Sequence, residues 1–201
     1  ELASVTKKNN LKASLIVFSD WTLIIGIFIA TATFPNPLTV LVAILLLGGR
    51  QMALGVLVHE TGHQSFFKSQ KVNNFVGTWL SGYWIFSNKA AYMTVHLLHH
   101  KHCGTKNDPD LKNFEAYPVP RKSLARKIFR DISGRLGWRR VLSIGKSIFR
   151  FKELKPSQKR MIFNSIFCNI CLWAALALSG HGWLYLLWPA AFMTSHMLIS
   201  R

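Results

Sequence analysis

Four apolar runs constrain the fold of this chain more than any other feature. They cover about residues 13–34, 38–60, 161–179 and 183–200. An α-helix rises about 1.5 Å per residue, so roughly 20 apolar residues cross the hydrocarbon core of a bilayer. A helix also satisfies its own backbone hydrogen-bonding groups, which lipid cannot do. The sequence therefore predicts four membrane-spanning helices.

Short polar connectors, PNP at 35–37 and SGHG at 179–182, join these runs into two helical hairpins. The stretch between the hairpins, residues 64–160, holds 20 of the 25 Lys and Arg residues. Because basic residues favour the cytoplasmic side of a membrane, this stretch and the N-terminus are predicted to be cytoplasmic. We expect residues 1–201 to form a single all-α, multi-pass membrane domain with a cytoplasmic cap.

A net charge of +17 also suits a nucleic-acid-binding protein, but half of the residues are hydrophobic. Within 121–155, basic residues alternate with apolar ones at intervals of three or four, as in helices that lie in the headgroup region. The neighbouring spans make anionic lipid the expected partner, and we expect no nucleic acid. Residues 72–87 are apolar but interrupted, which indicates a short interfacial or re-entrant segment.

Six of the eight histidines fall in two clusters with the spacing of metal ligands. HETGH places His59 and His63 at positions i and i+4, and HLLHHKH places His96, His99 and His100 at i, i+3 and i+4. Side chains with these spacings share one face of a helix. Neutral imidazoles that converge need a cation to share, and imidazole binds zinc, copper, iron and nickel.

The motif H-E-x-x-H is best known from zinc proteases, in which the glutamate acts as general base. In that alternative, Glu60 activates a water and Asp108 or Asp110 supplies the third ligand. It leaves the three histidines of the second cluster without a role. Five imidazoles are too many for one tetrahedral zinc site with an open position, so two metal ions fit better.

The order H-x-x-x-H, H-x-x-H-H and then GTKNDPDL resembles the membrane fatty acid desaturase superfamily, which includes lipid hydroxylases and carotenoid-modifying enzymes. The resemblance extends to GRQMALGVLVHETGH and to NNFVGTWLSGYW. It implies that five histidines bind two iron ions in a non-haem di-iron centre. These are His59, His63, His96, His99 and His100.

The resemblance also implies a reaction. Dioxygen is activated at the irons, hydrogen is removed from a long acyl chain, and electrons come from a separate donor such as ferredoxin or a small haem protein. The expected function is therefore oxygen-dependent desaturation of a fatty acyl substrate. A lipid or carotenoid hydroxylase of the same superfamily is the first alternative, and an intramembrane zinc protease is the second.

Three carboxylates are expected to support the metal ligands rather than to bind metal. Glu60 is predicted to orient an imidazole through its free N–H. Asp108 and Asp110 lie in an Asn-Asp-Pro-Asp turn that, by the resemblance, follows the second box and fixes it. The superfamily's third box, H/Q-x-x-H-H, is absent from these 201 residues, so we expect the sequence to be a fragment.

The remaining histidines are not assigned as ligands. His102 turns away from the face shared by the second box. His181 lies in the outer connector, across the bilayer from both boxes. His196 lies late in the fourth predicted span, where no motif covers it.

Two opposite charges fall inside the first predicted hairpin. Asp20 and Arg50 lie about 10 and 15 Å below the same membrane interface, at 1.5 Å per residue. A charge at that depth is costly unless it faces the bundle and finds a partner. We predict an ion pair between them that sets the register of the hairpin.

Overall fold

The computed structural model describes residues 7–200, which form α-helices and short 3-10 helices with no strand among them. The elements are α2 (Asn10–Thr33), α3 (Pro37–Gly62), α4 (Gln70–Trp79), η1 (Gly82–Ile85), α5 (Lys89–His102), α6 (Leu111–Phe114), α7 (Arg121–Ile132), α8 (Arg135–Phe149), η2 (Phe151–Glu153), α9 (Pro156–Leu178), η3 (Gly182–Leu186), α10 (Leu187–Met193) and α11 (Ser195–Ile199). The predicted all-α class is confirmed.

Three of the four predicted spans are long, continuous apolar helices. By length and composition, α2, α3 and α9 can each cross a membrane. The turn between α2 and α3 is closed by Asn36, whose side chain accepts hydrogen bonds from the backbone N–H groups of Leu38 and Thr39. Pro37 follows at the first helical position, where its missing N–H costs nothing. The first hairpin is therefore encoded locally.

The fourth span was predicted wrongly as one helix over 183–200. The chain instead forms η3, α10 and α11, three short segments in succession. Pro189 lacks an N–H and its ring would collide with the carbonyl of residue 185 in a continuous helix. A second break occurs at Thr194, whose backbone is not helical. There Ser195 Oγ donates to the carbonyl oxygen of Ile44, 2.6 Å away, which ties the break to α3.

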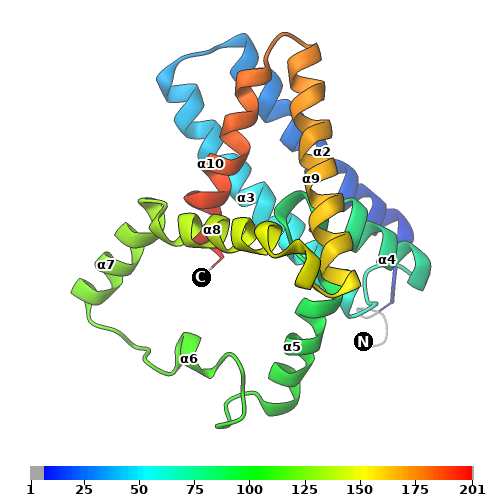
Figure 1. Cartoon of the computed structure of the whole chain (residues 1–201), viewed down its shortest axis with the longest axis vertical. Coiled ribbons are helices and arrows are strands. Elements are labelled where there is room, and N and C mark those ends of the chain that lie inside the picture. Colours follow the sequence, from blue (N-terminus) through cyan, green and yellow to red (C-terminus); the bar gives the residue numbers. More distant parts are fainter. Residues whose placement is uncertain (1–6, 201) are drawn as a thin grey trace.

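Helix α3 is the centre of the molecule, because α2, α4, α5, α10 and α11 all contact it. Figure 1 shows α2, α3, α9 and α10 side by side, with the connectors at 34–36 and 179–181 at one end and α5 at the other. The side chains of Leu47 and Leu54 on α3 are fully buried in the core. The contact between the C-terminal end of α3 and α5 determines where the two groups of histidines lie relative to each other.

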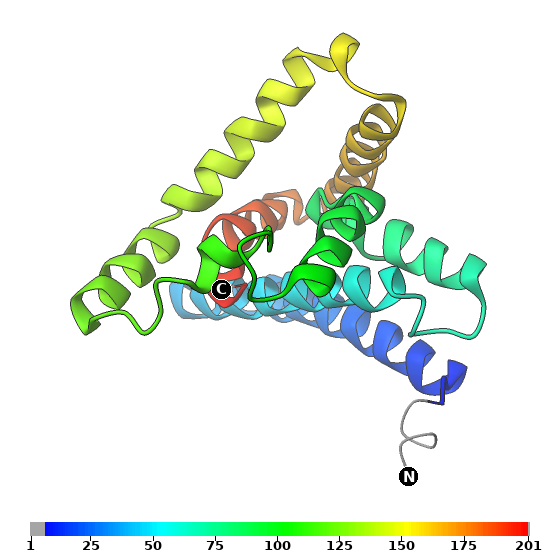
Figure 2. The same cartoon turned by 90° about the horizontal axis from the view of Figure 1, so that it is seen from below.

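The basic stretch 121–155 forms two helices, α7 and α8, which turn at Gly134. Seen from below, α8 runs along one edge of the bundle (Figure 2). Phe129, Trp138 and Phe149 are large exposed apolar side chains on these helices. The predicted helices are thus confirmed, while their contact with the headgroup region of a bilayer stays a prediction. Residues 72–87 form most of α4 together with η1.

The predicted ion pair between α2 and α3 is confirmed. Arg50 Nη1 lies 3.0 Å from Asp20 Oδ1, and the Asp20 residue is 3% exposed. The Arg50 side chain is less buried than its partner, with 34% of its surface exposed. Helix α3 therefore fixes its height against α2 through one charge pair within the apolar hairpin.

A double-mutant cycle tests this pairing. We expect Asp20→Asn and Arg50→Gln each to lower the free energy of unfolding by roughly 1–3 kcal/mol, because each leaves its partner unpaired inside the bundle. The double variant should lose less than the sum of the two, by about 1 kcal/mol or more. The measurement is unfolding of the purified full-length protein in detergent micelles. Additive losses would show that the two side chains act independently.

Candidate metal centre

The two histidine boxes meet because small residues let three helices approach closely. Gly62, inside HETGH, packs against Met93 of α5: a Cβ atom at Gly62 would lie 2.2 Å from the Met93 sulfur. A Cβ atom at Gly77 of α4 would lie 2.1 Å from Thr61 Oγ1. Neither position tolerates a side chain without movement of its neighbour. The glycine of the first box therefore places α5, which carries the second box, directly on α3.

A buried lysine holds the start of α5 to the end of α3. Lys89 is 8% exposed, and its Nζ donates to Asn74 Oδ1 at 2.7 Å. Its Nζ also lies 3.4 Å from the backbone oxygens of Thr61 and Asn73. The sequence analysis missed Lys89. Its position in the sequence could have indicated a special role, because Lys89 is the first residue of a helix, where the helix dipole disfavours positive charge.

Four of the five predicted ligands gather in one place. The nitrogen atoms of His59, His63, His96 and His100 all lie within 4.8 Å of one another. His96 Nε2 is 3.0 Å from His63 Nε2 and 2.9 Å from His100 Nε2. Two imidazole nitrogens that each lie about 2.1 Å from one ion are about 3.0–3.4 Å apart, depending on the angle between them. The spacing of the cluster suits metal ligands.

Hydrogen bonding alone does not satisfy this cluster. A ring nitrogen of a neutral imidazole either donates or accepts, and His96 Nε2 faces two other Nε2 atoms at once. Burial lowers the pKa of His63 and of His96 below the ordinary value, and the neighbouring imidazoles of His59 and His100 lower it further. These shifts favour the neutral form of both rings, which is the form that binds metals. The donor set fits a cation in the middle.

Two groups around the cluster fix the orientation of its rings. His59 Nδ1 lies 2.8 Å from Glu60 Oε1, and Ser65 Oγ donates to the other carboxylate oxygen at 3.2 Å. A proton on His59 Nδ1 leaves its Nε2 lone pair for a metal. Tyr92 stacks on His96 with ring centroids 5.1 Å apart. Tyr92 was also missed, although it lies four residues before His96 on the same helix face.

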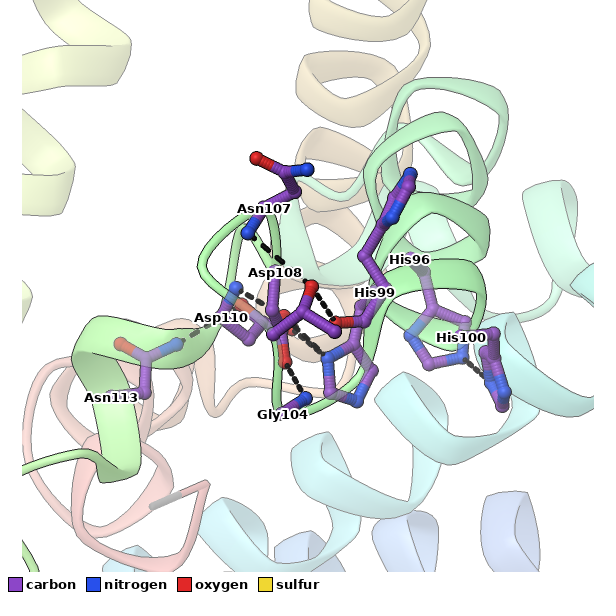
Figure 3. Close-up of polar contacts among 10 residues, drawn as sticks. His96, His99, His100, Gly104, Asn107, Asp108, Asp110 and Asn113 are labelled. Carbon is purple, nitrogen blue, oxygen red and sulfur yellow. Dashed lines mark hydrogen bonds and ion pairs between the residues drawn. The ribbon is translucent and has the colours of Figure 1, made fainter.

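His99 lies beside the cluster rather than within it. Its Nδ1 is 2.8 Å from Asp108 Oδ1, and its ring centroid is 6.1 Å from that of His96 and 5.9 Å from that of His100 (Figure 3). Cys103 lies close enough to form a second group of potential ligands with His99 and Asp108. The prediction that all five imidazoles surround one small volume therefore holds for four, and the fifth is turned toward a carboxylate.

Asp108 is the best-anchored carboxylate of the site. Its side chain is fully buried, and it accepts hydrogen bonds from the backbone N–H groups of Gly104 at 3.0 Å and of Asp110 at 2.8 Å. Burial by itself would raise the pKa of Asp108, but these bonds and the one to His99 lower it overall. The bond to Asp108 in turn raises the pKa of His99. Asp110 is more exposed, and its Oδ2 lies 3.8 Å from His99 Nδ1.

The other three histidines lie outside the cluster, as the sequence predicts. His181 is half-buried in the connector before η3, and its Nδ1 lies 2.7 Å from the carbonyl oxygen of Ser179. His196 is buried and stacks on Phe192 with ring centroids 5.2 Å apart. His102, at the end of α5, belongs to neither group of potential ligands found among residues 7–200.

Comparison with known proteins assigns this geometry to a family. The profile of the family "Fatty acid desaturase" matches residues 35–201, which include both histidine boxes. The chain belongs to the fatty acid desaturase family. Among curated proteins, dihydrorhizobitoxine desaturase of Bradyrhizobium elkanii is 30% identical over 118 residues, or 58% of this chain. The match spans 33% of that relative's length. No solved structure matches the chain significantly.

Family membership favours one of the two interpretations of H-E-x-x-H. The family match covers both histidine boxes, whereas the zinc protease alternative gives the second box no role. The structure agrees with this choice, since Glu60 is engaged by His59 and Ser65. The apolar helices and the family together indicate a membrane protein.

The unequal anchoring of the two aspartates gives a testable difference. We expect Asp108→Asn to lower the iron affinity of the full-length protein about 10–100-fold, because it weakens the acceptor that fixes the His99 ring. Asp110→Asn is the matched control and should change iron affinity much less. The measurement is bound iron per protein after dialysis against graded chelator. Equal losses in the two variants would contradict the role given to Asp108.

Proposed function

We propose that this chain carries the di-iron site of an oxygen-dependent desaturase that acts on a long-chain fatty acyl substrate. One observation carries the proposal: the two histidine boxes, 37 residues apart from His59 to His96, meet in one cluster of four imidazoles. The family match covers both boxes. The relative from Bradyrhizobium elkanii is itself named a desaturase, which supports the type of reaction.

The proposed metal ligands are those of the two boxes. His59, His63, His96 and His100 form the shared cluster, and His99 contributes from beside it. When bound, two iron ions supply the reduction of dioxygen and the removal of hydrogen from the substrate, with electrons from a donor such as ferredoxin or a small haem protein. The histidines are proposed to face the cytoplasm, where such a donor can dock.

The chain's own residues prepare the site for this chemistry. Glu60 and Asp108 each hold an Nδ1 proton on a neighbouring imidazole, so that the Nε2 atoms of His59 and His99 keep their lone pairs for metal. Burial keeps His63 and His96 neutral. Tyr92 covers one face of the His96 ring and restricts its rotation. These contacts fix the ligands before a metal arrives, as pre-organised sites require.

An apolar cavity between η1, α8, α9 and α10 supports an acyl substrate. It has a volume of about 160 Å³, and its lining includes Trp84, Ile85, Phe86, Trp188 and Phe192. Ile85 lies 4.0 Å from the position of a Cβ atom on Gly55, one helical turn before His59 on the same face of α3. One wall of the cavity is thus η1, which packs against α3 one turn before His59. An aliphatic chain suits this lining.

The test compares two histidine variants of the full-length protein. His96→Ala should lose iron and at least about 100-fold of the activity, because His96 is the centre of the cluster. His181→Ala is the matched control: it removes a histidine of the far connector, outside the cluster, and should keep both iron and activity. Metal content is measured by elemental analysis, and products from acyl lipids with oxygen and a reductant are measured by mass spectrometry.

The mass of the product and the bound metal distinguish the proposed function from its alternatives. A product lighter by two hydrogens identifies a desaturase, and a product heavier by one oxygen identifies the hydroxylase alternative. Normal turnover by the His96→Ala variant would refute the proposed site. Zinc without iron in the active protein would favour the protease alternative.

A further inference from the structure

A second, larger pocket lies away from the histidine cluster, behind the start of α5. Its volume is about 790 Å³, and it is enclosed by α4, η1, the first residues of α5 and the first turns of α9. In Figure 1 the lower end of α9 lies near α4 and the beginning of α5. Its lining residues include Asn74, Trp79, Tyr83, Lys89, Arg160 and Asn164.

The pocket carries two positive charges and no negative one. Lys89 and Arg160 line it, and none of its lining residues is Asp or Glu. The ammonium of Lys89 is held by neutral oxygens only, and neither cation forms an ion pair within residues 7–200. Burial lowers the pKa of Lys89, with no opposing charge to raise it. A buried cation without a counter-charge is costly, so an anion in this pocket would stabilise it.

The walls of the pocket indicate what kind of anion fits. Phe75 and Trp79 form an aromatic side, and Trp79 meets Tyr83 edge to face with ring centroids 5.0 Å apart. Tryptophan and tyrosine gather where a membrane meets water. Directly beyond Arg160 on the membrane helix α9, Phe163 and Phe167 are exposed apolar side chains. A ligand held at Arg160 thus has apolar helix surface next to it.

We propose that this pocket binds the phosphate of an anionic phospholipid, with the acyl chains lying along the exposed face of α9. The phosphate would accept hydrogen bonds from Arg160, for which a planar guanidinium is well suited. It would also supply the missing counter-charge for Lys89. Asn88 and Asn164 add neutral donors on the same walls.

Such a lipid would reinforce the metal site without belonging to it. Lys89 joins the start of α5 to Thr61, which lies between the two histidines of the first box. An anion that stabilises the charged form of Lys89 therefore stabilises the contact between the two boxes. This inference needs neither iron nor turnover, so it can fail while the proposed desaturase function stands.

The experiment measures lipid binding to the full-length protein in a neutral detergent, which removes the diffuse attraction of a charged bilayer. Short-chain phosphatidylglycerol, short-chain phosphatidylcholine and inorganic phosphate are titrated separately, with native mass spectrometry and the melting temperature as readouts. We expect phosphatidylglycerol to bind most tightly and to raise the melting temperature. Arg160→Gln should weaken that binding about tenfold, the effect of one lost charge-assisted hydrogen bond.

Arg139→Gln is the matched control, because Arg139 is an exposed arginine on α8 outside the pocket. It should leave the affinity unchanged within about twofold, since it touches no wall of the site. Lys89→Met should abolish the lipid-dependent rise in melting temperature and also lower the melting temperature without lipid. If that variant does not fold, Arg160→Gln still decides, because its side chain is exposed at the rim.

Three results would overturn the proposal. Equal binding of phosphatidylcholine and phosphatidylglycerol would show that net negative charge is not recognised. Equal stabilisation by inorganic phosphate would replace the lipid by a free anion. Equal weakening by Arg139→Gln and Arg160→Gln would show a general effect of positive charge rather than a built site.

Discussion

The contact between the last turn of α3 and the first two turns of α5 is the constraint on which the rest of the site depends. Gly62 lets Met93 pack against the α3 backbone, and Lys89, one turn earlier on the same face of α5, joins the two helices through the carbonyl oxygen of Thr61. Each helix by itself presents only its own histidines at helical spacing. A shift of one helix against the other by a single residue would rotate a box by about 100°. Convergence of the imidazoles is therefore a product of packing rather than of the motifs.

Much of the fold could be predicted from the sequence, because a lipid environment allows few backbone conformations. Long apolar runs must be helices, and a buried charge must find an opposite charge at its own depth. These rules gave three spans and the pairing of Asp20 with Arg50. They failed at the fourth span. Its high hydropathy predicted one continuous helix, although the chain breaks near Pro189 and at Thr194. The proline was visible in the sequence, but the break at Thr194 is stabilised by a bond from Ser195 to α3, which no local pattern reveals.

The site was less predictable than the fold, because its geometry, like the break at Thr194, depends on contacts between residues that are distant in the sequence. Helical spacing treats His96, His99 and His100 as equivalent members of one face. Their difference comes from Asp108, nine residues after His99, in a turn that folds back on the helix end. The partners of Lys89 lie 15 to 28 residues away on two other helices. Contacts of this kind depend on tertiary structure, so no window of sequence contains them.

The two boxes also differ in how firmly their carboxylates hold them. The Glu60 side chain is 40% exposed and lies in the last turn of α3, whereas the Asp108 side chain is fully buried. Asp108 also accepts two backbone hydrogen bonds, so moving it would leave buried N–H groups without acceptors. The second box is thus fixed by its own turn, independently of α3. The first box, with its more exposed carboxylate, is held less firmly and depends more on the packing of α3 against α5.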